Sequence, residues 1–158
     1  MKIIIVGDGK VGFTLAEHLS QEEHNVTVID TNDDALRHAS ESLDVMCVKG
    51  NGASISALKE SGVESADVLI AATSLDEVNM VCCLTAKQLG AKFTIARVRN
   101  VEYAMELSRM KRELGIDLAI NPENATAVEI SRLLRFPGAA NIETFCRGRV
   151  ELIGFRVR

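Results

Sequence analysis

The sequence predicts an α/β protein with a doubly wound, parallel Rossmann-type sheet, helices on both faces of that sheet, and a short C-terminal β-hairpin. Three observations predict it. Short β-branched runs alternate with longer helical patterns, a glycine-rich turn joins the first run to the first helix, and a Pro-Gly pair precedes two further strands. Continuous apolar strands separated by helices are typical of a parallel sheet covered on both faces.

The elements follow one another along the chain in a regular alternation. Strands are expected at 2–6, 26–30, 44–48, 67–71 and 93–98, with a weaker sixth strand at 117–120. Helices are expected at 10–22, 33–41, 53–61, 76–89, 101–113 and 123–135. Right-handed crossovers between parallel strands place a ligand at the carboxyl ends of the strands.

The last helix is expected to stop at Pro137-Gly138, since proline cannot continue it. Two strands around a turn at 147–149 then form the hairpin. Two strands are not stable alone, so we expect the chain to be a fragment of a longer protein.

Composition narrows the class of protein. The 158 residues are 47% hydrophobic and 25% charged, which is a globular composition. The formal net charge of −4 gives no attraction to nucleic acid. No stretch approaches the roughly 20 apolar residues of a membrane span. Without a C-x-x-C pair, the cysteines predict reduced, mostly buried thiols in a cytosolic protein, with no metal site; they are Cys47, Cys82, Cys83 and Cys146.

The glycine-rich turn predicts a phosphate site. Gly7 permits the tight turn out of the first strand, Gly9 lets backbone approach a pyrophosphate, and Gly12 lets the helix pack against the sheet. The amides at the start of that helix then face the phosphates. Lys10 lies where a cation reaches phosphate oxygens; the alternative is that it is only a solvated lysine at an exposed helix start. The buried face of the helix is expected to consist of Val11, Leu15 and Leu19.

Asp30, at the end of the second strand, predicts a ribose contact through hydrogen bonds to both hydroxyls. The alternative is that Asp30 only caps the next helix. Thr31 and Asn32 are available for that cap, which favours the ribose role. No Arg or Lys follows closely, which argues against NADP and leaves NAD(H), ATP, ADP and AMP as candidate ligands.

Other strand ends extend the predicted crevice. The turn at 50–52 brings backbone near the ligand, and small residues at 71–74 allow an adenine ring to lie flat, with Ser74 or Asp76 as an alternative cap of the next helix. Arg97 ends the fifth strand and needs an anionic partner, either a phosphate or a carboxylate such as that of Glu123.

Catalytic groups are missing from the predicted crevice. His18, His24 and His38 fall within or after helices and are interpreted as solvated surface residues. No strand end carries a His or Cys that would act as general acid or base. The sequence therefore predicts a protein that binds a nucleotide without turning it over.

Several stretches together resemble one family. They are "IIIVGDGKVGFTLAEHLS", "VTVID", "VKGNGAS", "AATSLDEVNMVCCLTAKQLGA", "IARVRNVEY" and "NPENATAVEISRLLRFPGA". They closely resemble the TrkA family, the peripheral nucleotide-binding subunits of Trk-type potassium uptake systems. The resemblance implies that residues 1–136 form an RCK (KTN) N-terminal domain with a crossover helix at 123–135, and that residues 137–158 form a hinge and the start of a truncated C-terminal segment.

The resemblance also implies a function. It implies a regulatory subunit that binds NAD(H) or an adenine nucleotide, assembles as a dimer or higher ring, and gates a potassium-translocating membrane subunit from the cytoplasmic face. Lys10 falls where some relatives place an arginine, and Asn51 where relatives commonly have Asp or His. The predicted cofactor-binding residues are Gly7, Asp8, Gly9, Lys10, Val11, Gly12, Asp30, Thr31, Asn51, Gly52, Ala72, Thr73, Ser74, Arg97 and Glu123.

Two helices are expected to carry the subunit interfaces, because their apolar residues exceed what one sheet face needs. They are the helix at 76–89, with Val81, and the helix at 123–135, with Leu133. For the first, the alternative is that a neighbouring helix of the same chain covers it. Two other functions stay open: the nucleotide-binding half of an NAD-dependent oxidoreductase whose catalytic domain is missing, and a free-standing nucleotide sensor.

Overall fold

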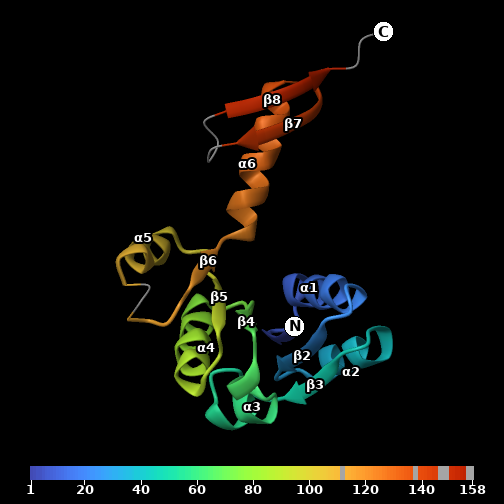
Figure 1. Cartoon of the computed structure of the whole chain (residues 1–158), viewed down its shortest axis with the longest axis vertical. Helices are drawn as coiled ribbons and strands as arrows, with labels where there is room; N and C mark the ends of the chain where they lie inside the picture. Colours follow the sequence, from blue (N-terminus) through green and yellow to red (C-terminus); the bar gives the residue numbers. More distant parts are fainter. Residues whose placement is uncertain (111–112, 137–138, 146–149, 156–158) are drawn as a thin grey trace. The chain divides into compact units, whose positions relative to one another are not determined.

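The computed structural model describes residues 1–110, 113–136, 139–145 and 150–155 (Figure 1). The chain divides into two compact units, Met1–Ile120 and Asn121–Arg158, which are described one at a time. The domain assignment made from the sequence, with its hinge in residues 137–158, stays a prediction.

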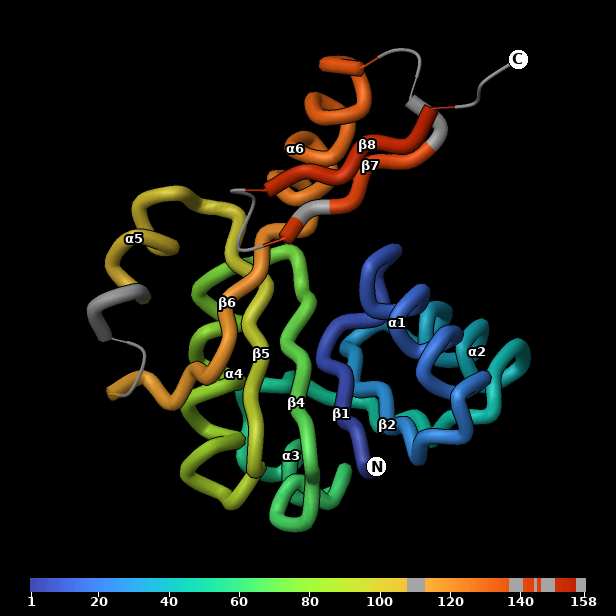
Figure 2. Tube along the Cα trace, turned by 45° about the horizontal axis from the view of Figure 1, so that its top comes forward, coloured from blue at the N-terminus to red at the C-terminus, as the bar shows by residue number. Residues whose placement is uncertain are grey.

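The first unit is built on a six-stranded sheet in the order β3-β2-β1-β4-β5-β6, in which every neighbouring pair is parallel. The strands are β1 (Lys2–Val6), β2 (Asn25–Asp30), β3 (Met46–Lys49), β4 (Val68–Ala71), β5 (Phe93–Arg97) and β6 (Leu118–Ile120). The chain starts in the centre of the sheet, runs to one edge and returns through β4 to the other edge (Figure 2). The predicted doubly wound sheet is confirmed.

Alternate residues of the strands feed two separate cores. In β1, Ile3 and Ile5 pack on one face of the sheet, and Ile4 and Val6 on the other. The first core includes Leu36, from α2 (Asp33–Ser42), and Ala16, from α1 (Lys10–Gln21). The second includes residues of α3 (Ile55–Glu60), α4 (Asp76–Leu89) and α5 (Val101–Met110). Each face is therefore covered by its own helices, α1 and α2 against α3 and α4 (Figure 2).

Local chemistry explains where these helices begin and end. The Asn32 side chain caps α2, accepting hydrogen bonds from the amides of Asp34 (2.9 Å) and Ala35 (3.4 Å). Gly90 ends α4 at φ +114°, in the left-handed region where a side chain is disfavoured. A 3-10 turn at Val63–Ser65 follows Gly62 and was not predicted from the sequence.

The second unit contains α6 (Pro122–Arg135), β7 (Ala139–Phe145) and β8 (Val150–Phe155). Pro122 occupies the first turn of α6, and the Asn121 side chain accepts a hydrogen bond from the Asn124 amide at 2.9 Å. The strands β7 and β8 are antiparallel, which confirms the predicted hairpin. The predicted helix stop at 137–138, the turn at 147–149 and Cys146 lie outside the described residues.

The apolar residues of α6 are largely exposed within this unit. No residue of α6 is buried, and Leu133 and Leu134 expose 58% and 72% of their surface. Glu151 of β8 pairs with Arg135 at 3.3 Å and with Arg132 at 3.7 Å, which joins the helix to the hairpin.

Candidate functional site

The glycine loop between β1 and α1 is tight at two glycines and open at the third. Gly7 has a φ of +96°, and a Cβ there would lie 2.8 Å from the Thr73 nitrogen. A Cβ on Gly12 would lie 1.8 Å from the Gly7 carbonyl oxygen, so α1 packs directly on the loop. Gly9, the N-cap of α1, has no atom within 4 Å of an added Cβ. The loop is therefore held against β4 and α1 while its centre faces open space.

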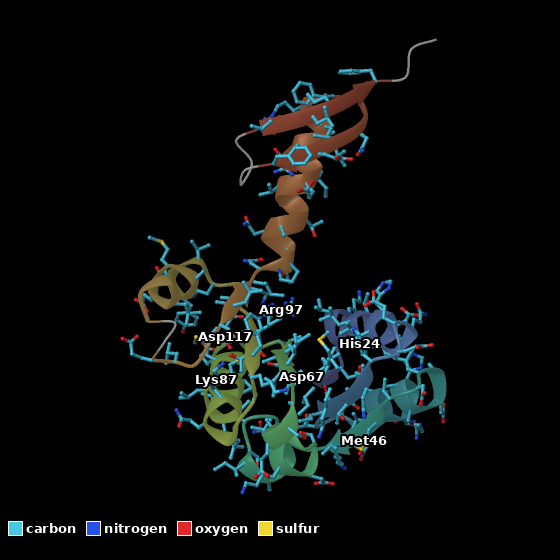
Figure 3. The ribbon with its side chains drawn as sticks, in the orientation of Figure 1. His24, Met46, Asp67, Lys87, Arg97 and Asp117 are labelled. Atoms are coloured by element: carbon cyan, nitrogen blue, oxygen red, sulfur yellow. The ribbon has the colours of Figure 1, made fainter. Side chains whose placement is uncertain are left out.

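A cleft of about 560 Å³ lies at the carboxyl ends of the central strands. It collects most of the predicted site from segments far apart in the sequence. Arg97 reaches it from the end of β5 (Figure 3). The lining residues are Val6, Gly7, Gly9, Lys10, Val11, Ile29, Asp30, Thr31, Gly50, Asn51, Gly52, Ala72, Thr73, Ser74, Leu75, Val78 and Arg97.

Two predicted residues of the first unit do not line this cleft. Gly12 lies behind the loop, packed on Gly7, and Asp8 is buried beside it. Glu123 lies in the first turn of α6, in the second unit, and its part in the site stays a prediction. The cleft also contains apolar walls that the sequence did not single out, namely Val6, Ile29, Leu75 and Val78.

The Asp30 carboxylate is fixed at the rim of the cleft by two backbone amides. Its Oδ2 accepts a hydrogen bond from the Asp8 amide at 2.6 Å, and its Oδ1 accepts one from the Asn32 amide at 2.8 Å. The alternative that Asp30 caps α2 is wrong, because Asn32 is the N-cap. A carboxylate held in this way keeps further lone pairs for donors such as the hydroxyls of a ribose.

Asp8 is a buried acid that the sequence prediction treated only as part of the glycine loop. Its side chain is 9% exposed, and among the described residues neither of its carboxylate oxygens has a hydrogen-bond partner. Burial, followed by the negative charge of Asp30, raises the pKa of Asp8 from its ordinary 3.8 to about 6, while His38 acts in the opposite direction. His38 stacks on Phe13 with ring centroids 4.9 Å apart, so its interpretation as a merely solvated residue was incomplete.

The start of α1 supplies the polar end of the cleft. Lys10 is exposed at the first position of the helix, beside the free amides of its first turn. Val11 lines the cleft and, unlike Leu15 and Leu19, is not packed against the core on that side of the sheet, so its predicted place on the buried face of α1 is wrong. That face centres on Gly12 and Ala16, with Leu15 and Leu19 packed at its margin.

Asn79, in α4, does not line the cleft but holds two residues that do, Thr73 and Arg97. It is fully buried, and its Oδ1 accepts hydrogen bonds from the Thr73 amide (2.9 Å) and from the Thr73 hydroxyl (2.7 Å). Its Nδ2 donates to the carbonyl oxygens of Thr73 (3.2 Å) and Arg97 (2.9 Å). The Thr73 hydroxyl also lies 3.2 Å from the Leu75 carbonyl oxygen and accepts a hydrogen bond from the Leu75 amide at 3.3 Å, so both its backbone and its side chain are held in place.

Asp76 makes a second link from the same helix. Its Oδ2 accepts hydrogen bonds from the amides of Arg99 and Asn100, each at 2.8 Å, and Arg99 donates to the Ser74 carbonyl. Asp76 and Ser74 were considered as caps of α4, but the N-cap is Leu75 with no side-chain cap bond. The sequence of α4 does not single out Asp76 and Asn79, because the helix also carries Glu77, Thr85, Lys87 and Gln88.

The cleft has the chemistry of a binding site for an anion and a diol. Its ionisable lining residues, within the described parts of the chain, are Lys10, Asp30 and Arg97. The same parts contain no group of three or more His, Cys, Asp or Glu side chains arranged for a metal ion.

Outside the cleft, burial raises the pKa of the Cys82 thiol to about 12, so this buried cysteine stays protonated. No helix among the described residues has the length and apolar character needed to cross a membrane.

Solved structures share this architecture. The TrkA-N domain of the inner membrane protein ybaL from Escherichia coli superposes with a TM-score of 0.75 at 23% identity, covering 84% of this chain and 96% of that one. The GsuK channel bound to NAD gives a TM-score of 0.65 at 27% identity, covering 75% of this chain and 21% of that one. The GsuK structure bound to ADP gives a TM-score of 0.65 at 27% identity, covering 76% of this chain and 31% of that one.

Relatives in sequence are potassium uptake proteins. The Trk system potassium uptake protein TrkA of Halomonas elongata is 44% identical over 158 residues, which are 99% of this chain and 35% of that protein. The TrkA homolog of Archaeoglobus fulgidus is 41% identical over 157 residues, 99% of this chain and 36% of that protein. The chain thus spans about a third of the length of these relatives. Since residues 3–122 also match the profile described as the TrkA-N domain, the chain belongs to the TrkA-N family.

Proposed function

We propose that this domain is a regulatory nucleotide-binding module of a Trk-type potassium uptake system, with NAD(H) or an adenine nucleotide (ATP, ADP or AMP) as its ligand. The observation that carries the proposal is the cleft itself, in which the open centre of a glycine loop and the fixed Asp30 carboxylate line the same space. A pyrophosphate and a ribose diol are the groups that these two features suit.

Each part of the cleft then has a role toward the ligand. The Asp30 carboxylate accepts hydrogen bonds from the ribose hydroxyls, and the first amides of α1 hold the phosphates. Lys10 and Arg97 supply positive charge near the phosphates. The small residues Ala72 and Thr73 leave room for the adenine ring. Thr31, Asn51, Gly52 and Ser74 complete the rim.

Binding without turnover is the testable core of the proposal. The purified chain should show a melting temperature that rises with the concentration of NADH, ADP or AMP. NADPH should stabilise it much less, because a 2′-phosphate would meet the Asp30 carboxylate. Steady hydride transfer or ATP hydrolysis by the pure protein would instead favour the oxidoreductase alternative. No stabilisation by any of these nucleotides would refute the proposal.

The partners follow from the family rather than from the cleft. We propose that the full protein is peripheral at the cytoplasmic face of the membrane and gates a potassium-translocating subunit. Relatives at 44% and 41% identity are named as Trk system proteins, which supports this assignment. The test is potassium flux through a reconstituted Trk-type membrane subunit, with and without the nucleotide-loaded full-length protein. A flux that is the same under both conditions would contradict the assignment.

Self-association is the remaining part of the proposal. We propose a dimer or higher ring whose interfaces include α4 and α6, because Val81 exposes 46% and Leu133 58% of their surface. Light scattering at micromolar concentration should detect a species larger than the monomer. Val81→Asp and Leu133→Asp test the two helices separately. A monomeric wild-type protein, with both variants folded, would contradict this part.

A further inference from the structure

Asp8 carries a feature that the proposed binding mode leaves unused. It is the residue between Gly7 and Gly9 in the loop, and its carboxyl group is buried without a hydrogen-bond partner among the described residues. An ionised carboxylate in such a place is costly, because it has lost its water without gaining a donor. A neutral carboxyl group avoids most of that cost.

The groups around Asp8 come from three elements. Asp30, at the end of β2, accepts a hydrogen bond from the Asp8 amide at 2.6 Å and raises the pKa of the Asp8 carboxyl through its negative charge. His38, on α2, lowers it when protonated. Cys47, on β3, is close enough for Asp8 to raise the pKa of its thiol in turn. Asp30 thus links Asp8 directly to the rim of the cleft.

We propose that Asp8 is an affinity-determining residue that holds a proton more tightly when the cleft contains a phosphorylated nucleotide than when the cleft is empty. The proposal rests on the proposed function and adds a regulation to the same site. An ionised Asp8 places a second negative charge next to Asp30, within the loop whose amides attract the phosphates. That charge opposes an anionic ligand, whereas a neutral Asp8 does not.

The direction of the effect follows from linkage. A bound ligand that carries negative charge makes the ionised form of Asp8 less favourable, so binding raises the pKa of Asp8 and takes up a proton. By reciprocity, raising the pH through the range in which Asp8 ionises weakens the ligand. Because burial raises the pKa of Asp8 to about 6, this range borders on neutral pH.

The first test is the dissociation constant of NADH between pH 5.5 and 7.5. NADH is chosen because the charge on its diphosphate stays constant over this range. For the wild-type chain, binding should weaken by roughly three- to tenfold as the pH rises, the scale of one added charge at an effective dielectric between those of protein and water. Asp8→Asn keeps the size of the side chain and the backbone bond to Asp30, and its NADH affinity should not change with pH.

A matched control removes the same charge elsewhere. Asp44 is exposed just before β3, at the amino end of that strand, whereas the cleft lies at the carboxyl ends of the strands, so Asp44→Asn should keep the pH dependence of the wild type. Calorimetry at pH 6 in two buffers of different ionisation enthalpy then measures the number of protons taken up when NADH binds. The wild type and Asp44→Asn should take up protons on binding NADH, and Asp8→Asn should take up close to none.

The possible outcomes separate this inference from the proposed function. Absence of NADH binding at every pH would refute the nucleotide site itself. Normal binding with the same pH dependence and the same proton uptake in the wild type and Asp8→Asn would refute only the role of Asp8. If Asp8→Asn loses the pH dependence while Asp44→Asn keeps it, Asp8 is the residue that couples the proton to the nucleotide.

Discussion

Replacing Gly9 with alanine separates the ligand-binding role of the glycine loop from its role in folding. Gly9 has φ −74° and ψ −175°, a conformation that any residue adopts. A Cβ built there meets no atom within 4 Å. The described fold therefore has no need of glycine at this position. A phosphate drawn to the N-terminus of α1 does need it, because the methyl group would stand where the ligand approaches.

The two effects differ in size. The free energy of unfolding of Gly9→Ala should stay within about 1 kcal/mol of the wild type, because alanine is a somewhat poorer N-cap than glycine but reduces the entropy of the unfolded chain. The binding free energy of NADH should become less favourable by about 1.5–3 kcal/mol, the scale of one hydrogen bond to a charged group. That loss corresponds to a dissociation constant roughly 10- to 150-fold higher.

Calorimetric titration with NADH, together with urea unfolding of the same samples, measures both quantities. Gly12→Ala is the contrasting variant, because its Cβ would lie 1.8 Å from the Gly7 carbonyl oxygen and should destabilise the fold strongly. Adenosine has no phosphate, so its affinity for Gly9→Ala should change little. If Gly9→Ala binds NADH as tightly as the wild type, the phosphates do not lie at this loop.

Three further predictions concern the charged residues of the site. Asp30→Ala should weaken adenosine and NADH alike by about 1.5–3 kcal/mol in titration, while urea unfolding changes little because Asn32 still caps α2; unchanged affinity would remove Asp30 from the ribose site. Lys10→Ala should weaken NADH more than adenosine, since only NADH offers phosphates to a cation; equal losses would give Lys10 a structural role. Without ligand, the stability of the wild type to urea, measured relative to Asp8→Asn, should fall as the pH rises from about 4 to about 6, because the folded state binds the Asp8 proton more tightly than the unfolded state. At pH 7.5, where the wild type carries the unpaired charge, Asp8→Asn should be about 1–3 kcal/mol more stable; a stability difference that is the same at both ends of this range would contradict the raised pKa.

The sequence predicted the alternation of strands and helices well, because the buried strands are apolar runs with clear boundaries. The third strand is an instructive difference, since it was expected at 44–48 and observed at Met46–Lys49. Its start depends on where pairing with β2 begins, at Thr27 opposite Met46, and not on its own composition. The 3-10 turn at Val63–Ser65 is too short to produce any periodicity.

For the site, the glycine loop and the acidic residue after the second strand predicted the residues that line the cleft, but not the buried residues that hold or surround them. Gly7, Gly9 and Asp30 are recognisable because each has a fixed spacing from a strand end. Asp8 and Asn79 are different, since their significance depends on burial and on partners from other elements. A polar residue that becomes fully enclosed leaves no mark in the local sequence pattern.

The bonds made by the first turn of α4 have a mechanical consequence. Asn79 holds the Thr73 backbone and the Arg97 carbonyl oxygen at once, and Asp76 holds the amides of Arg99 and Asn100. The end of β4, the first turn of α4 and the segment leading into α5 are therefore tied to one another by hydrogen bonds. A shift of Thr73 would strain the bonds of Asn79 and would so be felt at Arg97, the last residue of β5, next to the entrance of α5.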